Sequence, residues 1–397
     1  MNLNILFLTY FEVTPQKGGI ERVTDIVATN LSEKNGIKCY SAYYYSNNLV
    51  HTNFSGKICL EWGEEYNQLH RFISENNISV VINQQIYSLN KIIVRLRQTL
   101  FVYYVYFQHD RTAIDLCSDF SYYKYAAHHG NNTRKRCMFA VKFMIAPVYA
   151  MMRKLYYRHL YRSIYHNVDT IVLLSRYFIP VFLKSMGKLS DSRKCISIIN
   201  NSVTLPSVTT PEDISKKLRE VLIVSRLTEE RKRISLAIKI WQLYQNSFEE
   251  SKEWILRIVG NGEYASDYKK LVAKKKIPNI IFEGQVEDTI EYYRRASAFI
   301  MTSDAEGWGL TLVEAQQMGV VPIAFNSYES IHEIIQDGVN GVLVKNSDCT
   351  EFVRKLHELL NDDNKRRSMA INGLEVTRIF SVDRMISQWL KILDNLS

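Results

Sequence analysis

Short runs rich in β-branched and aromatic residues recur along this chain, and longer segments with helical periodicity separate them. In the first half these runs predict strands at 4–11, 38–45, 79–86, 101–109, 169–175 and 195–201. In the second half they predict strands at 220–227, 254–262, 279–286, 298–303, 320–327 and 341–346. Apolar strands that alternate with helices form parallel sheets covered on both faces. The pattern therefore predicts an α/β fold with two doubly wound, Rossmann-like parallel-sheet domains in tandem.

A stretch with two prolines and little periodicity, SVTLPSVTTPEDISKK, separates the two sets of strands. We expect a first domain at 1–202, a linker at 203–218 and a second domain at 219–379. The last segment, 380–397, has the apolar periodicity of a helix that needs a partner surface, and we expect it to pack back on the first domain. In such sheets ligands bind beyond the carboxyl ends of the strands, so two facing domains would form one deep cleft.

The net charge of +9 is concentrated in the first half of the chain. Residues 1–200 contain 24 Lys and Arg against 13 Asp and Glu. Within them, residues 120–168 contain nine basic residues, eight tyrosines and no acid. This segment suits a helix at a membrane surface, or the binding of an acceptor carried on a lipid pyrophosphate. The alternative is a helix pair with an aromatic core face and a solvated basic face; nucleic acid is not expected as a partner, because no nucleic-acid module accompanies the segment.

Neither a signal-peptide pattern nor an apolar run of about 18 residues is present. The six cysteines are scattered without the spacing of a zinc site, which is typical of reduced thiols in a cytoplasm. We therefore expect a cytoplasmic protein, peripherally associated with the inner face of the cytoplasmic membrane and without a structural metal.

The stretch DAEGWGLTLVEAQQMGVVPIAF, residues 304–325, follows a predicted strand and turns through glycines into a helix that begins at about Leu310. The start of a helix presents unpaired N–H groups and the positive end of the helix dipole, which together favour phosphate. Gly307 and Gly309 would let the backbone approach a ligand, and Thr311 could donate a hydroxyl. This turn is a candidate phosphate site.

Two glutamates flank that turn. Glu314 could accept hydrogen bonds from the vicinal hydroxyls of a ribose, and Glu306 could reach the hydroxyls of a sugar in the cleft. Taken singly, Glu314 could equally be a first-turn glutamate that the helix dipole favours, and Glu306 a solvated loop acid.

Cations follow another predicted strand on the same sheet edge. Ser225 and Arg226 end the strand EVLIVSRL, and Lys232 begins the next helix. Arg226 and Lys232 could clamp a diphosphate and offset the charge that builds on a leaving phosphate. A basic helix start on a solvated face is the alternative, and it accounts well for Arg231 and Arg233.

Two further strand ends carry glycine turns, VGNGEY and EGQVED. A base could lie against Gly260 and hydrogen-bond the backbone near Val286. Either turn alone is a weak signal, because G-x-G occurs by chance in many loops.

Together the segments SRLTEERKRISLAI, RIVGNGEY, IIFEGQVED, the stretch at 304–325 and IIQDGVNGVLV resemble the retaining glycosyltransferases of family 4, of the bacterial surface polysaccharide type. The resemblance covers nearly all of residues 220–346. It implies the GT-B fold, and an E-x7-E motif in which Glu314 binds the ribose and Glu306 the donor sugar, with Arg226 and Lys232 on the diphosphate. The full set of donor-binding residues that we expect is Gly18, Gly19, Ser225, Gly260, Gly262, Val286, Gly307, Trp308, Gly309, Leu310, Thr311 and Glu314.

In the first half the segment TPQKGGIERV is similar to the family's early glycine loop, in which Gly18 and Gly19 would contact donor phosphate or acceptor. A simple tight turn before a helix is the competing interpretation. His109 ends the strand of VYFQHD, where family members often place a histidine that faces the donor sugar, although a strand-end histidine can also be structural.

The resemblance implies a transferase that moves a sugar from a nucleotide donor, UDP-linked, to an oligosaccharide or lipid-linked acceptor in polysaccharide, lipopolysaccharide or capsule synthesis. Catalytic roles fall to Glu306, Arg226, Lys232 and His109, with no metal and no other cofactor, since no D-x-D motif is evident. Two alternatives stay open. One is an inverting transferase with Asp110 or His109 as the base, and the other is a non-catalytic scaffold that binds nucleotide sugar or membrane.

Overall fold

The structure is a computed structural model of the chain that describes residues 3–14, 18–46, 53–110, 133–187, 196–206 and 209–396. Within the helix at 133–167 it describes the side chains of residues 137, 138, 140, 141, 144, 147, 148 and 150–167. The chain divides into two compact units, Met1–Ser202 together with Val382–Ser397, and Val203–Ser381. The first unit is therefore formed by two separate stretches of sequence.

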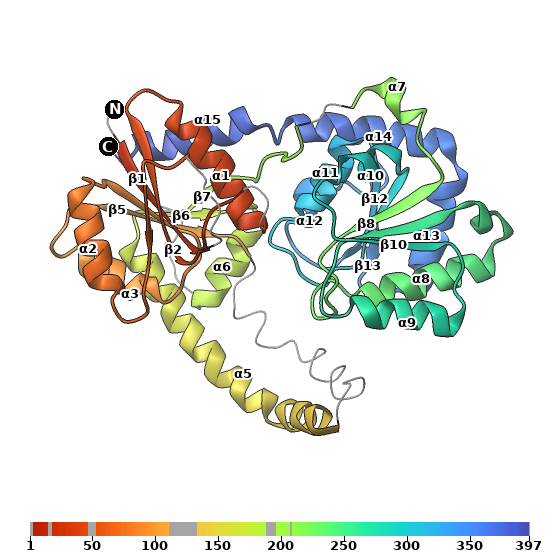
Figure 1. Cartoon of the computed structure of the whole chain (residues 1–397), viewed down its shortest axis with the longest axis horizontal. Coiled ribbons are helices and arrows are strands. Elements are labelled where there is room, and N and C mark those ends of the chain that lie inside the picture. Colours follow the sequence, from red (N-terminus) through yellow and green to blue (C-terminus); the bar gives the residue numbers. More distant parts are fainter. Residues whose placement is uncertain are drawn as a thin grey trace. The chain divides into compact units, whose positions relative to one another are not determined.

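The described part of the first unit contains a seven-stranded parallel sheet in the order β3-β2-β1-β4-β5-β6-β7. Its strands are β1 (Leu3–Phe11), β2 (Ile37–Tyr45), β3 (Gly56–Cys59), β4 (Val80–Asn83), β5 (Tyr103–Gln108), β6 (Thr170–Leu173) and β7 (Ile196–Ile198). Its helices are α1 (Gly19–Ser32), α2 (Glu65–Glu75), α3 (Leu89–Leu96), α5 (Thr133–Asn167), α6 (Phe178–Met186) and α15 (Val382–Asp394) (Figure 1).

Among the residues described in the second unit, six parallel strands form a sheet in the order β10-β9-β8-β11-β12-β13. They are β8 (Glu220–Val224), β9 (Ile255–Val259), β10 (Ile280–Gly284), β11 (Ala298–Met301), β12 (Val321–Asn326) and β13 (Val342–Lys345). The helices are α7 (Pro211–Ile214), α8 (Ile234–Ser247), η2 (Glu249–Glu253, a 3-10 helix), α9 (Ala265–Lys275), α10 (Ile290–Arg295), α11 (Leu310–Gln317), α12 (Ile331–Ile334), α13 (Cys349–Asn361) and α14 (Asp363–Arg378).

The two parallel, doubly wound sheets confirm the predicted fold class. Every predicted strand overlaps an observed one, because runs buried on both faces of a parallel sheet are almost continuously apolar. One observed strand, β3, was not predicted from the sequence. It is four residues long, lies at the sheet edge and contains a single β-branched residue, Ile58, so its sequence carries little strand signal.

The stretch that we predicted as a linker, 203–218, lies within the second unit. The N–H of Val203 donates to the carbonyl of Phe380 at 2.8 Å. Thr210 caps α7 through a capping box with Asp213, and Ile214 is buried in the core of the second unit. The hydrogen bonds and the burial of Ile214 therefore attach this segment to the second unit, although its prolines alone suggest a flexible connector.

The C-terminal helix α15 belongs to the first unit, where it contacts α1. Trp389 is 1% exposed and packs edge-on against Phe107 of β5, with ring centroids 5.4 Å apart. The apolar stripe of this helix thus forms part of the core of a unit whose other elements precede residue 203.

The long helix α5 is anchored at its C-terminal end, where Leu160, Tyr161 and Ile164 are buried and the helix contacts α6. Its N-terminal part extends away from the sheet of the first unit (Figure 1). Among the helices in the described ranges, none is both long and apolar enough to cross a membrane.

Candidate active site

The strand order of the second unit creates a topological switch point between β8 and β11. The chain proceeds from β8 to β9 and β10 on one side, and then returns to β11 on the other. The loops that follow β8 and β11 therefore diverge, and ligands of open α/β sheets bind in the crevice between such loops.

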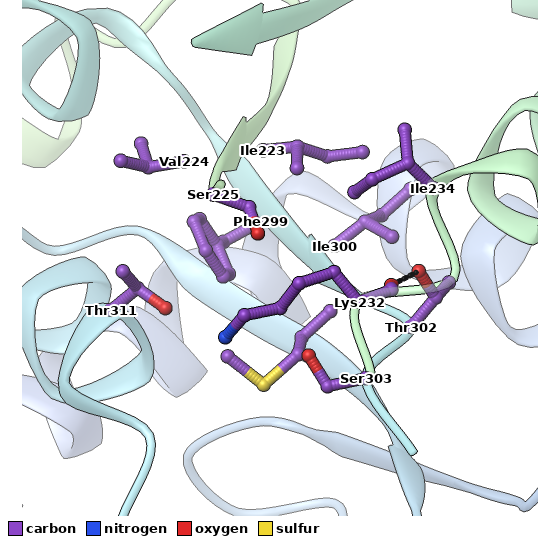
Figure 2. Close-up of a pocket in the computed structure, with 11 residues that line it drawn as sticks. Ile223, Val224, Ser225, Lys232, Ile234, Phe299, Ile300, Thr302, Ser303 and Thr311 are labelled. Atoms are coloured by element: carbon purple, nitrogen blue, oxygen red, sulfur yellow. Dashed lines mark hydrogen bonds between the residues drawn. The ribbon is translucent and has the colours of Figure 1, made fainter. Parts of the chain in front are cut away.

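A small, partly open pocket lies at this switch point (Figure 2). Its lining residues are Ile223, Val224, Ser225, Lys232, Ile234, Phe299, Ile300, Met301, Thr302, Ser303 and Thr311. The pocket therefore brings together three of the predicted site residues, Ser225, Lys232 and Thr311, from the loop after β8 and the start of α11.

Lys232 is the charged residue among those that line the pocket. Figure 2 shows its side chain extended across the pocket toward the side on which Thr311 lies. Its ammonium forms an ion pair with Glu306, and the two side chains retain 27% and 15% of their exposure. The hydroxyl of Thr302 donates to the Lys232 carbonyl at 2.9 Å, which fixes the backbone from which the ammonium extends. Two residues predicted to bind different parts of a donor are thus neighbours.

Arg233 is a structural residue, which corrects the interpretation of a solvated helix start. Its guanidinium donates to the carbonyls of Thr302 at 2.7 Å and Ser303 at 3.1 Å, and pairs with Asp304 at 3.0 Å. Its backbone has φ +49°, in the left-handed region, immediately before α8. Arg233 therefore ties the loop after β11 to the loop that carries Lys232.

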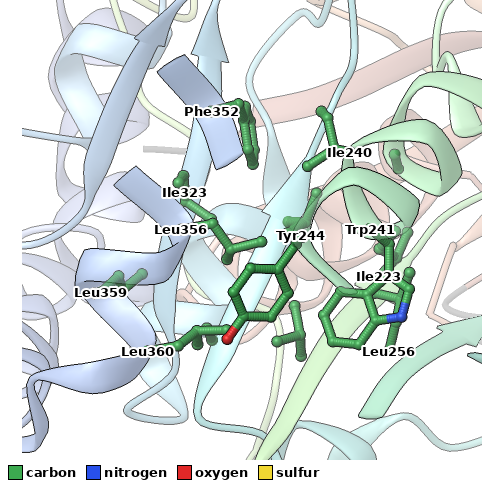
Figure 3. Close-up of a cluster of buried hydrophobic side chains, with 14 of the residues drawn as sticks. Ile223, Ile240, Trp241, Tyr244, Leu256, Ile323, Phe352, Leu356, Leu359 and Leu360 are labelled. Carbon is green, nitrogen blue, oxygen red and sulfur yellow. The ribbon is translucent and has the colours of Figure 1, made fainter. Parts of the chain in front are cut away.

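The helix that follows Lys232 is anchored in the core behind the sheet. Trp241 and Tyr244 of α8 are fully buried, and Tyr244 packs beside Leu356 and Leu360 of α13 (Figure 3). The indole N–H of Trp241 donates to the carbonyl of Pro278 at 3.2 Å, so its polar atom is satisfied. The buried face of α8 thus anchors, in the core of the second unit, the end of the loop that carries Lys232.

The turn into α11 has the geometry of a helix start. Gly309 precedes the helix with φ +100°, and a Cβ there would lie 2.7 Å from the hydroxyl of Tyr328. The positive φ and the nearness of the Tyr328 hydroxyl both explain why a glycine occupies this position. Leu310 and Thr311 begin the helix, and their N–H groups belong to the first turn, which lacks intrahelical acceptors.

Trp308, which we expected to bind the donor, has a buried side chain. Its side chain is 3% exposed and packs edge-on against Phe380, with ring centroids 5.3 Å apart. The hydroxyl of Ser330 donates to the carbonyl of the neighbouring Gly307 at 2.9 Å. This turn is thus fixed from inside the second unit, and the indole does not line the pocket.

Glu314 is 2% exposed and lies beneath two hydroxyl groups. Thr204 donates to its Oε1 at 2.6 Å, and Tyr293 donates to its Oε2 at 2.9 Å. Its carboxylate is therefore engaged with protein hydroxyls, the same chemical groups that a ribose offers. The sequence identified Glu314 but neither of these two hydroxyl donors.

Other predicted donor-binding residues lie at neighbouring strand ends but outside the pocket lining. A Cβ on Gly260, which has φ +130°, would lie 1.9 Å from the carbonyl oxygen of Ser225, and one on Gly262 would lie 2.4 Å from that of Leu227. Both glycines are thus explained by the close passage of the loop after β8. Val286 is half-buried in the loop after β10, and Arg226 is exposed beside Ser225.

The remaining predicted residues belong to the first unit. Gly18 precedes α1 and Gly19 is its first residue. His109 follows β5 and is buried, with Nε2 against Oε1 of Gln84, whose own amide donates to Thr24 at 2.8 Å. A neutral imidazole donating from Nε2 is consistent with this chain of hydrogen bonds, and burial lowers the pKa of His109 to about 3.

Sequence reasoning missed Ser303, Thr204 and Tyr293. Ser303 could have been found, because it is the last residue of a predicted strand at the same sheet edge as Ser225. Thr204 and Tyr293 gave no signal, because each reaches Glu314 from a distant segment.

Residues 209–376 match the family described as glycosyl transferases group 1. A glycosyltransferase of Haemophilus influenzae, named as uncharacterized, is 26% identical over 195 residues, covering 48% of this chain and 54% of the relative. The GalNAc-alpha-(1->4)-GalNAc-alpha-(1->3)-diNAcBac-PP-undecaprenol alpha-1,4-N-acetyl-D-galactosaminyltransferase of Campylobacter jejuni is 26% identical over 173 residues, covering 44% and 47%. The chain thus spans about half the length of these curated relatives.

The solved structure of Anabaena Alr3699/HepE in complex with UDP and glucose is similar over the whole fold. The TM-score is 0.73 at 16% identity, and the match covers 99% of this chain and 100% of that one. This likeness confirms the GT-B fold. The matched family and the names of the relatives support the expected enzyme class, a glycosyltransferase.

The burial of His109 predicts a pH dependence of stability. Its pKa is about 3 in the folded protein against an ordinary value of 6.5, so below pH 6.5 the unfolded chain binds the extra proton. This contribution to stability is complete above pH 6.5 and is lost as the pH falls toward 3, by at most about 1.4 kcal/mol per pH unit. We expect His109→Gln to lose less stability than the wild type between pH 6.5 and 4.5 in urea denaturation. The exposed control His159→Gln should follow the wild type, and equal slopes for all three proteins would contradict the prediction.

Proposed function

We propose that this chain is a glycosyltransferase that moves a sugar from a UDP-sugar to an oligosaccharide or lipid-linked acceptor in the synthesis of a surface polysaccharide. The observation that carries the proposal is the pocket at the β8/β11 switch point, where Ser225, Lys232 and Thr311 meet and Glu306 contacts Lys232. Two names add support: the Anabaena protein was solved with UDP and glucose, and the Campylobacter relative is named for a PP-undecaprenol acceptor.

In this proposal the second unit binds the donor through separate groups. Lys232, Arg226 and the first N–H groups of α11 hold the diphosphate, because two cations and the positive end of a helix dipole oppose its charge. Glu306 accepts hydrogen bonds from the sugar, and Glu314 accepts them from the ribose. Binding a diphosphate at Lys232 exchanges the Glu306 ion pair for phosphate oxygens, which leaves the Glu306 carboxylate available for a sugar hydroxyl.

The reaction that we infer retains the anomeric configuration. The bond between the anomeric carbon and the phosphate oxygen breaks, and the acceptor oxygen forms its bond to that carbon on the same face. The acceptor proton passes to the departing phosphate oxygen, so the products are the glycoside and UDP. The protein's contribution is to hold the reactants and to stabilise the charge that develops on the diphosphate.

The burial of His109 argues against the inverting alternative in which this histidine is the base. A general base works best with a pKa near the working pH, and burial lowers that of His109 to about 3. The bond to Gln84 also occupies the ring nitrogen Nε2.

Removing the charge of Lys232 should abolish most of the transfer. We expect Lys232→Met to lower kcat/KM by about 10²–10³-fold, the scale seen when a transition-state stabiliser is removed, and Glu306→Gln to lower donor hydrolysis. Lys239→Met, at an exposed position of α8, is the matched control and should keep wild-type activity. Equal background release of UDP by the wild type and Glu306→Gln would favour the non-catalytic scaffold.

The stereochemistry and the metal requirement can be measured together. We expect the product to have the anomeric configuration of the donor by NMR, and the rate to be unchanged after treatment with a chelator, because Lys232, Arg226 and the α11 start supply the positive charge. An inverted product would point to the alternative with an acid–base residue such as Asp110. A rate that falls in chelator and returns with Mg²⁺ would contradict the metal-free mechanism.

We also propose that α5 places the protein on the inner face of the cytoplasmic membrane. Val141, Met144, Val148, Met151 and Leu155 recur at helical spacing, and Met144, Val148 and Met151 are each at least 60% exposed. The helix contains no acidic residue, and Arg153, Lys154 and Arg158 are within one turn of this stripe. Apolar side chains flanked by cations suit an anionic lipid surface. Residues 120–132 of the predicted segment lie outside the described residues.

A double variant of this stripe tests the membrane proposal. We expect Met151→Glu with Leu155→Glu to abolish flotation of the protein with vesicles that contain phosphatidylglycerol, because buried carboxylates oppose insertion and repel the lipid charge. Leu243→Glu, an exposed leucine of α8 in the second unit, is the control. Flotation that is equal for all variants, or equal with purely zwitterionic vesicles, would contradict the role of this helix.

A further inference from the structure

The two hydroxyls on Glu314 differ in their access to solvent. Tyr293 is fully buried, whereas Thr204 is half-buried. Thr204 therefore covers the side of the carboxylate nearer to solvent, and Tyr293 holds it from the interior.

Thr204 lies in a segment without helix or strand, at 203–206, at the point where the chain enters the second unit. Besides the bond from Val203 to Phe380, this segment is held by α11. The side-chain amide of Gln317 donates to the carbonyl of Leu205 at 2.6 Å, three residues along the helix from Glu314. The helix whose first turn borders the pocket therefore also holds the entry segment.

We propose that Thr204 is a positioning residue that competes with the ribose of the donor for Glu314. This inference rests on the proposed function, in which Glu314 accepts hydrogen bonds from ribose hydroxyls. A ribose hydroxyl can replace the Thr204 hydroxyl on Oε1 because both are alcohol donors of similar strength. Tyr293 stays on Oε2 and keeps the carboxylate oriented, and the entry segment loses one of its contacts with α11 when donor binds.

The exchange makes an unusual mutational prediction: removing a polar group near the site should strengthen binding. Thr204→Val keeps the shape of the side chain but leaves Oε1 without this donor, and a bound ribose restores the lost hydrogen bond. We expect the Kd for UDP to fall about tenfold, the size of one hydrogen bond to a charged group. Tyr293→Phe should instead weaken UDP binding several-fold. In this proposal Tyr293 donates to the Glu314 carboxylate both in the free protein and in the UDP complex, so its loss leaves the carboxylate less well oriented.

The experiment is calorimetric titration of the full chain with UDP and with inorganic pyrophosphate, which lacks ribose. Thr204→Val should bind UDP more tightly and pyrophosphate as the wild type does. Thr204→Ser keeps the hydroxyl and should restore wild-type affinity. Thr209→Val is the matched control, because the Thr209 hydroxyl contacts the sulfur of Met318 at 3.7 Å rather than a carboxylate.

Three results would overturn the inference. If the wild type binds UDP and Thr204→Val binds it equally or more weakly, Thr204 is not a competitor, while the proposed donor site stands. If Thr204→Val strengthens the binding of UDP and of pyrophosphate equally, the substitution acts through a general change in the structure of the site and not through the ribose. If the wild type binds no UDP, the proposed donor site fails and this inference with it.

If Thr204→Val fails to fold, amide hydrogen exchange of the wild type can test whether Thr204 leaves Glu314 when UDP binds. We expect the amides of residues 203–205 to exchange faster when UDP is bound, because the entry segment loses its bond to Glu314. Unchanged or slower exchange in a sample that is saturated with UDP would overturn the inference.

Discussion

The edge of the second sheet depends on one guanidinium. Arg233 reaches the carbonyls of Thr302 and Ser303, pairs with Asp304, and donates to the side chain of Asn346 at 2.8 Å. These partners belong to the loops after β11 and β13, while Arg233 itself ends the loop after β8. A planar group with five N–H donors can satisfy acceptors in several directions at once, which a lysine cannot do in fixed geometry. The contacts between these three loops hold Lys232 at the pocket, so a residue outside the pocket lining supports the position of one that is proposed to bind the donor.

The architecture could be predicted because the central strands are buried on both faces and are therefore almost continuously apolar. Lys232, Glu306 and the start of α11 could also be predicted to lie close together, since residues at the carboxyl ends of parallel strands share one edge. The role of Arg233 could not, because its left-handed backbone and its acceptors are properties of the folded loops. The sequence alone did not distinguish it from the solvated cations that commonly begin a helix.

The glycines and the buried tryptophan show a second limit of sequence reasoning. Gly260 is required because the Ser225 carbonyl passes within 1.9 Å of where a Cβ would stand, and the sequence does not distinguish this cause from the approach of a ligand. Trp308 lies between two predicted site residues, yet its ring packs against Phe380, which is distant in the chain. Local spacing identifies the loop that carries a site, but tertiary packing decides which of its side chains face outward.

The assignment of α15 to the first unit has a consequence for dissecting this protein. A fragment from Val203 to the C-terminus would carry an amphipathic helix deprived of the surface that covers Trp389, and its exposed stripe would promote self-association. A fragment that ends at Ser202 would lack α15, which forms part of the core of the first unit. Independent expression of the halves is therefore best served by ending the second at Ser381 and by fusing residues 382–397 to the first through a short tether.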